Sequence, residues 1–182
     1  MIDNKLWETE EEEFNALSVL SNISRYNTRY RIKNESVAAH TFYTIWFTAN
    51  ICSKLELSPR VTYLAMEAAM VHDIPEIYIN DITYDCKKLI PELGALIAPF
   101  EETIVRKLSK GSANILFDPS NVEEKLINLI VRYADVVSVK QYALSEIKLG
   151  NTSFKDILEG AEDRVEELSK DLIRVLGEYR RN

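Results

Sequence analysis

The chain has 182 residues, of which 46% are hydrophobic, and this is enough for a single domain with a proper core. Its net charge of -7 argues against a general binder of nucleic-acid polymers, whereas a local basic pocket could still hold a small phosphorylated molecule. Two cysteines, Cys52 and Cys86, are too few for a disulfide framework. The sequence shows no charged-then-apolar leader and no long apolar span, so we expect a cytoplasmic protein without membrane contact.

The first part of the chain predicts a helix followed by a basic segment. An acidic run over residues 8–13 is typical of a solvated helix start, because acids favour the positive end of the helix dipole. The expected helix continues with an apolar stripe formed by Phe14, Leu17 and Leu20. Basic and aromatic residues then alternate over 25–34. In an acidic chain, this alternation predicts a phosphate pocket.

The next helix carries the first of the two histidines. Asn34 or Ser36 is expected to cap it, and it should run to about Glu56. Residues at three- and four-residue steps share one face of a helix, which places His40 on the same apolar face as Val37.

A third helix should end at a histidine and an aspartate side by side. Ser58 reads as its N-cap and Pro59 as its first residue, and Pro75 discourages helix at the residue before it. His72 falls on the buried stripe of this helix. Asp73 lies at the negative end of the dipole, where an acid is disfavoured. This aspartate therefore needs a compensating cation.

Beyond this point we expect a short helical turn and a loop over 75–82, followed by another helix. Loops beside a metal site commonly carry substrate contacts. Pro91 should begin the new helix, Pro99 should kink or restart it, and Gly111 should end it. Its expected buried side comprises Leu93, Leu96, Ile97, Phe100, Ile104 and Leu108.

A long helix follows, with a carboxylate in its interior. Ser120 and Glu123 have the spacing of a capping box, and Gly150 supplies a C-terminal stop. Asp135 lies on a largely apolar stripe of this helix. A buried carboxylate without a partner costs several kcal/mol, so Asp135 also needs a cation or hydrogen-bond donors.

The remaining pattern predicts one all-α domain. A last amphipathic helix spans 154–178, and we find no confident strand, no repeat and no linker long enough to divide the chain. We therefore expect residues 1–182 to form a single domain, with its motifs within about 25–150 and the last helix packing on that part.

His40, His72, Asp73 and Asp135 together favour a metal site. A single buried histidine is usually a hydrogen-bonded core residue, and a lone aspartate in a helix often pairs with arginine. The ordered set is harder to dismiss, because these are the chain's only histidines and each lies beside a predicted apolar face. Two imidazoles and two carboxylates suit a divalent ion, here Co, Mn, Zn, Ni, Fe or Mg.

This order of His, then His-Asp, then Asp resembles the HD-domain metal-dependent phosphohydrolases, with the four residues in the ligand positions. The flanking residues are similar to bacterial 5'-deoxynucleotidases within that group. The similarity covers Arg25-Tyr26 and the segment 33–40, then His72-Asp73 with Glu76, Asp81 and Lys87, and then 132–135.

The resemblance implies a helical HD fold, a homodimer and removal of the 5'-phosphate from deoxyribonucleoside monophosphates. It implies that Glu76 handles protons and that Asp81 orients water or binds the sugar. Arg25, Lys33 and Lys87 would hold phosphate.

The chain departs from the family pattern at Tyr26. The family places a tryptophan after the phosphate-binding arginine, and that ring is expected to exclude a 2'-hydroxyl. Tyr26 is smaller and carries a hydroxyl, which implies a looser preference for deoxyribonucleotides.

Three alternatives stay open on the sequence. The first is a deoxynucleoside triphosphate triphosphohydrolase, which releases tripolyphosphate instead of orthophosphate. The second is a cyclic-nucleotide or alarmone hydrolase, although its companion motif is missing here. The third is a non-catalytic nucleotide-binding module, against which the presence of Glu76 counts.

Overall fold

The computed structural model describes residues 6–83, 86 and 89–181, and every regular element in these ranges is a helix. The extended pairing that they contain is an isolated antiparallel bridge between Ser24 and Ser36. The predicted all-α class is therefore confirmed. None of the described helices is both long and apolar enough to cross a lipid bilayer.

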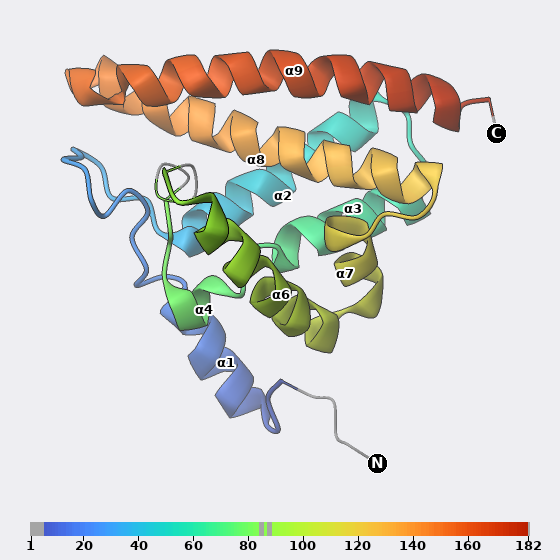
Figure 1. The fold of residues 1–182 in the computed structure, drawn as a ribbon, viewed down its shortest axis with the longest axis horizontal. Coiled ribbons are helices and arrows are strands. Elements are labelled where there is room, and N and C mark those ends of the chain that lie inside the picture. Colours follow the sequence, from blue (N-terminus) through green and yellow to red (C-terminus); the bar gives the residue numbers. More distant parts are fainter. Residues whose placement is uncertain (1–5, 84–85, 87–88, 182) are drawn as a thin grey trace.

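Four helices form the main body. α2 (Val37–Lys54) packs against α3 (Pro59–Val71) and α8 (Val122–Lys148), and α9 (Lys155–Tyr179) lies along α8. Figure 1 shows α8 and α9 side by side across one side of the molecule. The main core lies between these helices and is filled by small and branched side chains. Its fully buried members include Cys52, Val61, Ala65, Ala68, Ala69, Leu126, Ile127 and Ile130.

The helix starts around the site follow their sequence signals. The hydroxyl of Ser36 accepts a hydrogen bond from the amide of Ala39 and begins α2. Ser58 caps α3 in the same way, with Pro59 as the first helical residue. Because these caps satisfy amides that the helix leaves free, they fix where each helix begins.

The N-terminal helix lies outside the main body. α1 (Glu10–Val19) has a capping box in which Thr9 and Glu12 bond each other's backbone amides, so the acidic run is a helix start as expected. The stripe predicted for it is only partly right, because Leu20 is buried whereas Phe14 is 71% exposed. α1 lies beside α4 (Glu76–Ile79), the short helical turn expected after Pro75.

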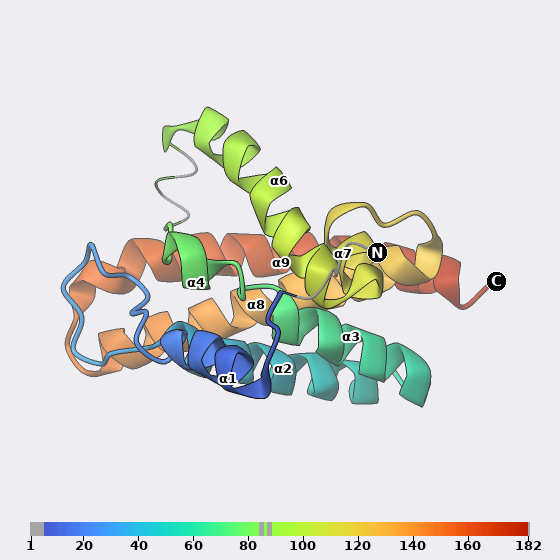
Figure 2. The ribbon, with the colours of Figure 1, turned by 90° about the horizontal axis from the view of Figure 1, so that it is seen from below.

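The region after Pro91 differs most from expectation. α6 (Pro91–Leu108) runs through Pro99 without a break, and it ends before Gly111, which lies inside a second helix, α7 (Lys110–Phe117). The break comes from Ser109, whose extended backbone interrupts the helix and whose hydroxyl caps α7. α6 stands out from the body in Figure 2 and packs mainly on α7. Two residues of its expected buried side, Leu96 and Phe100, are consequently exposed.

The long helix α8 begins one residue later than the expected capping box. Asn121 is its N-cap and accepts from the amide of Glu124, while Ser120 donates its own amide and hydroxyl to Glu124. Gly150 adopts φ 98°, a left-handed conformation that favours glycine, and it ends the helix as predicted. A 3-10 turn, η1 (Thr152–Phe154), then leads into α9.

Candidate active site

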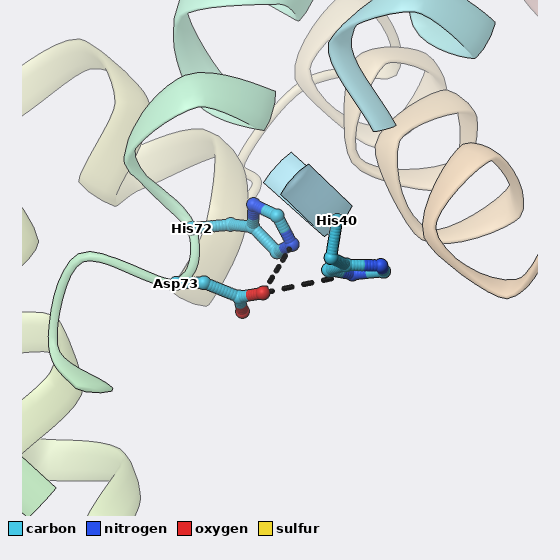
Figure 3. Close-up of side chains that lie close together, drawn as sticks. All are labelled: His40, His72 and Asp73. Atoms are coloured by element: carbon cyan, nitrogen blue, oxygen red, sulfur yellow. Dashed lines mark ion pairs between the residues drawn. The ribbon is translucent and has the colours of Figure 1, made fainter. Parts of the chain in front are cut away.

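Three helices bring four candidate metal ligands together. His40 lies in the first turn of α2, His72 is the C-cap of α3 with Asp73 next to it, and Asp135 lies in the middle of α8. His40, His72 and Asp73 each offer a ligand atom, and these atoms lie within 4.8 Å of one another (Figure 3).

Asp135, the fourth candidate ligand, joins this group by its contact with His40. Its Oδ1 lies 2.9 Å from His40 Nε2, whereas Asp73 Oδ2 lies 3.6 Å from the same nitrogen. Asp135 is less enclosed than its apolar stripe predicted, because its side chain is 36% exposed. The carboxylate therefore lies at the open edge of the group.

His40 is fully buried, and both of its ring nitrogens have partners: Asp135 at Nε2, and Arg25 and Ser138 at Nδ1. Arg25 Nη1 lies 2.6 Å from Nδ1 and Ser138 Oγ lies 3.2 Å from it. Because a guanidinium has donors only, Nδ1 accepts the hydrogen bond from Arg25. Burial, followed by the charge of Arg25, lowers the pKa of His40. The imidazole is thus neutral and carries its proton on Nε2, facing Asp135, and a metal ion at Nε2 requires this proton to leave.

His72 and Asp73 form a charged pair. Burial alone would lower the pKa of His72, but Asp73 outweighs it and the pKa rises to about 9. Burial alone would raise the pKa of Asp73, and His72 instead holds it well below its usual range. His72 Nδ1 contacts the carbonyl oxygen of Ala69 at 2.7 Å, which orients the ring.

These four residues fit a divalent metal. His72 Nε2 is buried and is ion-paired with Asp73 Oδ2 at 3.1 Å, without the geometry of a hydrogen bond. A metal ion at His72 Nε2 would take the place of the proton that pairs this nitrogen with Asp73, and the ion would then bind both side chains. A hydrogen bond from His40 also lowers the pKa of Asp135 despite burial, so both carboxylates are ionised. Nitrogen and carboxylate donors of this kind are typical of hydrolytic metal sites.

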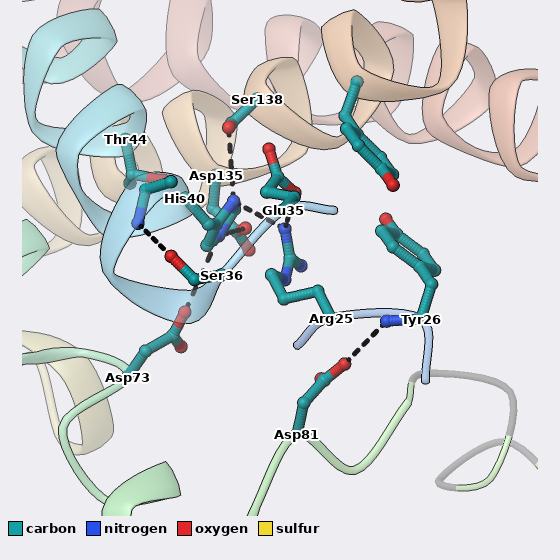
Figure 4. Close-up of polar contacts among 12 residues, drawn as sticks. Arg25, Tyr26, Glu35, Ser36, His40, Thr44, Asp73, Asp81, Asp135 and Ser138 are labelled. Carbon is teal, nitrogen blue, oxygen red and sulfur yellow. Dashed lines mark hydrogen bonds and ion pairs between the residues drawn. The ribbon is translucent and has the colours of Figure 1, made fainter. Parts of the chain in front are cut away.

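Arg25, for which the family resemblance implies phosphate binding, lies immediately beside this group. Its segment pairs with the start of α2, where the Arg25 amide donates to the Glu35 carbonyl oxygen at 2.9 Å. Its guanidinium donates to Glu35 Oε2 at 3.2 Å as well as to His40 (Figure 4). Burial alone would lower the pKa of Arg25, but neighbouring anions raise it, so the cation is permanent.

The ring of Tyr26 lies behind Arg25. It stacks on Tyr142, with ring centroids 5.3 Å apart, and meets Phe154 edge to face. The guanidinium carbon of Arg25 lies 5.4 Å from the centre of the Tyr26 ring. Tyr26 is only 9% exposed, so most of its surface contacts this aromatic cluster and Arg25.

Asp81 connects the two segments that flank the site. Its Oδ2 accepts a hydrogen bond from the backbone amide of Tyr26 at 3.1 Å (Figure 4). Tyr26 has φ 55°, a left-handed conformation that is unfavourable for a tyrosine, and this bond helps to hold it. The structure thus brings Asp81 to Arg25 and Tyr26.

Glu76 faces a hollow of about 200 Å³ next to the metal ligands. Its Oε2 is buried and makes no hydrogen bond with the described residues. Burial, then Asp73 and Asp81, raises the pKa of Glu76 to about 9, so this carboxyl group holds a proton at neutral pH. The hollow is lined by His72, Asp73, Pro75, Glu76, Glu101, Leu116 and Phe117.

Two expected phosphate-binding lysines are not placed at this centre. Lys33 has an exposed side chain, and its backbone is bound to Tyr142 and Glu146 on α8. Lys87 lies outside the described residues.

The structure adds two residues that the sequence analysis did not assign to the site. Glu35 pairs with Arg25, and burial raises its pKa while Arg25 partly opposes that rise. Ser138 holds His40 Nδ1. Ser138 follows Asp135 by three residues and so shares its helix face, which was the available signal. The signal for Glu35 was its place in the motif-like segment 33–40, although the pairing with Arg25 depends on how the segment before α2 folds back.

A helical body that brings His, His-Asp and Asp from three helices to one centre defines the class of HD-domain metal-dependent phosphohydrolases. The family model of the YfbR-like 5'-deoxynucleotidases matches residues 13–178. The chain belongs to this family, and it is a metal-dependent phosphohydrolase of deoxynucleotides.

Solved structures share the fold at low sequence identity. Protein PH0347 of Pyrococcus horikoshii is 20% identical, with a TM-score of 0.69 over 92% of this chain and 98% of the other. An HD-domain phosphohydrolase of Listeria innocua is 20% identical, with a TM-score of 0.64 over 94% and 86%.

A third structure is the cyanophage S-2L HD phosphohydrolase DatZ, bound to dA and one catalytic Zn2+ ion. It is 18% identical, with a TM-score of 0.65 over 96% of this chain and 99% of the other. Comparison with curated proteins gave no significant match.

Proposed function

We propose that the protein removes the 5'-phosphate from deoxyribonucleoside monophosphates. The observation that carries this proposal is the contact of Arg25 with His40, which puts a permanent cation beside the metal ligands. A cation and a metal side by side suit a terminal phosphate, since a guanidinium can bind two of its oxygens at once. The deoxynucleoside dA described for the cyanophage phosphohydrolase supports a deoxyribose substrate.

The metal ligands are His40, His72, Asp73 and Asp135 in this proposal. A divalent ion bound there polarises phosphoryl oxygens and lowers the pKa of water. Zn2+ is named for the cyanophage relative, and the donor set here also suits Mn, Fe, Co or Ni.

Glu76 is the proposed acid in the mechanism. Cleavage of the phosphate ester requires a proton for the departing 5'-oxygen of the sugar. Glu76 holds a proton at neutral pH because of its burial and the nearby Asp73 and Asp81, and its Oε2 has no competing partner among the described residues. A carboxyl group with these properties can donate that proton and later take one from water.

Arg25 binds the phosphate in this scheme, and Glu35 keeps its guanidinium in place. Asp81 holds the Tyr26 turn and can also reach the sugar or a water. Lys33 and Lys87 are proposed as outer phosphate contacts. The hollow of about 200 Å³ is smaller than the roughly 300–1,000 Å³ of ligand pockets, so the nucleotide must extend beyond it.

A panel of nucleotides tests this proposal. The 5'-mono- and triphosphates of deoxyadenosine, deoxycytidine, deoxyguanosine and thymidine, with the matching ribonucleotides, are incubated with each of several metals. Orthophosphate from the deoxyribonucleoside monophosphates is the expected product. Tripolyphosphate from the triphosphates would instead identify a triphosphohydrolase.

We also propose one domain over residues 1–182, a cytoplasmic location and a homodimer. Support for the dimer is the outer face of α2, which leaves Phe42, Tyr43 and Trp46 between 47% and 61% exposed. Aromatic residues are enriched where proteins associate. Light scattering of the wild type should give twice the chain mass, and Trp46→Glu should shift it to the monomer. A monomeric wild type would refute the dimer.

A further inference from the structure

Outside the metal centre, α8 carries a carboxylate whose bonding is unusually complete. Glu146 is fully buried, and three N–H groups donate to it. Oε2 accepts from the amide of Ile32 at 2.8 Å and from Asn151 Nδ2 at 2.7 Å, and Oε1 accepts from the amide of Lys33 at 2.7 Å. Burial alone would raise the pKa of Glu146, but these hydrogen bonds lower it. Glu146 is therefore a charged acceptor for a distant segment.

The same segment is held at its carbonyl groups. Asn151 Nδ2 also donates to the Tyr30 carbonyl oxygen at 3.0 Å, and the hydroxyl of Tyr142 donates to the Lys33 carbonyl oxygen at 2.6 Å. Residues 30–33 contain no regular helix or strand. Side chains at the C-terminal end of α8 thus supply hydrogen bonds that secondary structure provides elsewhere.

This anchored segment is joined to the phosphate-binding residues. Arg31 Nη1 donates to the Tyr26 carbonyl oxygen at 2.8 Å, and the Tyr26 ring stacks on Tyr142. Arg25 is the next residue and contacts His40. One face of α8 carries, at three- and four-residue steps, the residues that contact His40 and the residues that contact the segment 26–33. They are Asp135, Ser138, Tyr142 and Glu146.

We propose that Glu146 is a positioning residue that sets the phosphate affinity of the active site by fixing the segment 26–33. This inference rests on the proposed role of Arg25 in binding phosphate. Arg25 can bind the phosphate only if its backbone is held where the guanidinium reaches both Glu35 and the substrate. Since the segment has no helix or strand to hold it, the Glu146 carboxylate takes that role.

The donor pattern makes a sharp distinction between glutamate and glutamine. All three partners of Glu146 are N–H donors, so the site needs an acceptor at each oxygen. Glu146→Gln keeps the shape but turns an NH2 group toward an N–H donor. Glu67 offers a matched control, since it accepts from the hydroxyls of Ser109 and Ser112 at 3.1 Å and 2.9 Å. Hydroxyls can also accept, so Glu67→Gln can keep both hydrogen bonds.

The experiment compares wild type, Glu146→Gln, Glu67→Gln and Tyr142→Phe in two assays. The first measures kcat and KM for deoxyadenosine 5'-monophosphate with saturating metal. We expect Glu146→Gln to raise KM by about tenfold while kcat changes by less than about threefold. Tyr142→Phe, which loses only the bond to Lys33, should move KM in the same direction by less. Glu67→Gln should leave both constants near wild type.

The second assay does not depend on activity. Trypsin can cleave after Arg29, Arg31 and Lys33, and cleavage there requires the segment to leave α8. We expect faster cleavage at these sites in Glu146→Gln and an unchanged rate in Glu67→Gln.

If the wild type hydrolyses none of the nucleotides, the proposed function fails. Equal cleavage rates in Glu146→Gln and wild type would overturn the positioning role. Tyr142→Phe decides the same question if Glu146→Gln does not fold. A fall in kcat at unchanged KM would also overturn it.

Discussion

His40 Nε2 and Asp135 Oδ1 lie 2.9 Å apart, and this contact joins the first turn of α2 to the middle of α8. Arg25 holds the other nitrogen of the same imidazole. The ring is therefore fixed between a carboxylate at the open edge of the centre and a cation from the segment before α2. In the proposed mechanism, the metal site and the phosphate site therefore both contact the buried side chain of His40.

The metal centre leads to the first prediction. His72→Ala or Asp135→Ala should lose bound metal by elemental analysis and lose hydrolysis of deoxynucleotides together, because each removes a ligand atom. Removing metal from the wild type with a chelator should also lower its melting temperature, since an ion that binds only the folded state stabilises it. Asp163→Asn, an exposed change on α9, is the control. Full metal occupancy in both ligand variants would refute the ligand assignment.

Glu76→Gln should separate catalysis from metal binding. The variant keeps the size of the side chain but cannot supply or take the proton, so kcat should fall by about 10²–10⁴. Metal content and KM should stay close to wild type. Glu159→Gln, at an exposed position of α9, serves as the control. Near-normal turnover in Glu76→Gln would remove Glu76 from the mechanism, and loss of metal would make it a ligand instead.

The meeting of the four candidate metal ligands could be predicted, because each is unusual at its own position in the sequence. His40, His72 and Asp73 are polar residues at apolar helix positions or beside a helix end, and few structural roles explain all of them. Periodicity and caps located their helices to within a few residues. Asp135 was found by the same argument, although the structure leaves it more exposed than an apolar stripe suggests.

Other features depend on how distant segments meet, and no local pattern reports them. Gly111 suggested a helix end, but the helix instead ends before Ser109, whose hydroxyl caps the next helix. The contacts of Glu146 could not be predicted either, because its partners include backbone amides of a segment far away in sequence. The burial of Tyr26 likewise depends on Tyr142 and Phe154.

Glu146 should also make stability depend on pH. Its pKa is lowered in the folded protein, so its stabilising contribution is present above the unfolded pKa of about 4.3 and is lost as pH falls through the folded value. Lys33 supports the charged form, and the neighbouring Tyr142 is a neutral phenol in this range. The difference in urea midpoint between wild type and Glu146→Gln should be largest near pH 7 and should shrink below about pH 4. A difference that is constant with pH would contradict this account.

The last prediction concerns Tyr26 and the choice of sugar. The family resemblance gives this position the task of excluding a 2'-hydroxyl, whereas the structure puts the ring behind Arg25 and against Tyr142. A ring in that place supports the guanidinium, through cation–π attraction and by filling the space behind it. Loss of the ring should then lower kcat/KM for deoxyribonucleotides and ribonucleotides alike.

We therefore expect Tyr26→Ala to lower kcat/KM for both sugars by about tenfold or more, with their ratio changing by less than about threefold. Tyr26→Phe keeps the ring and should stay near wild type, because stacking does not need the hydroxyl. Arg25→Ala should lower kcat/KM for both substrates further and should also leave their ratio unchanged, because both carry the same phosphate group. The measurement is kcat/KM for deoxyadenosine and adenosine 5'-monophosphates in each variant. A ratio that moves tenfold toward the ribonucleotide in Tyr26→Ala would show that the ring contacts the sugar directly, because a support acting only through Arg25 has no means of telling the two sugars apart.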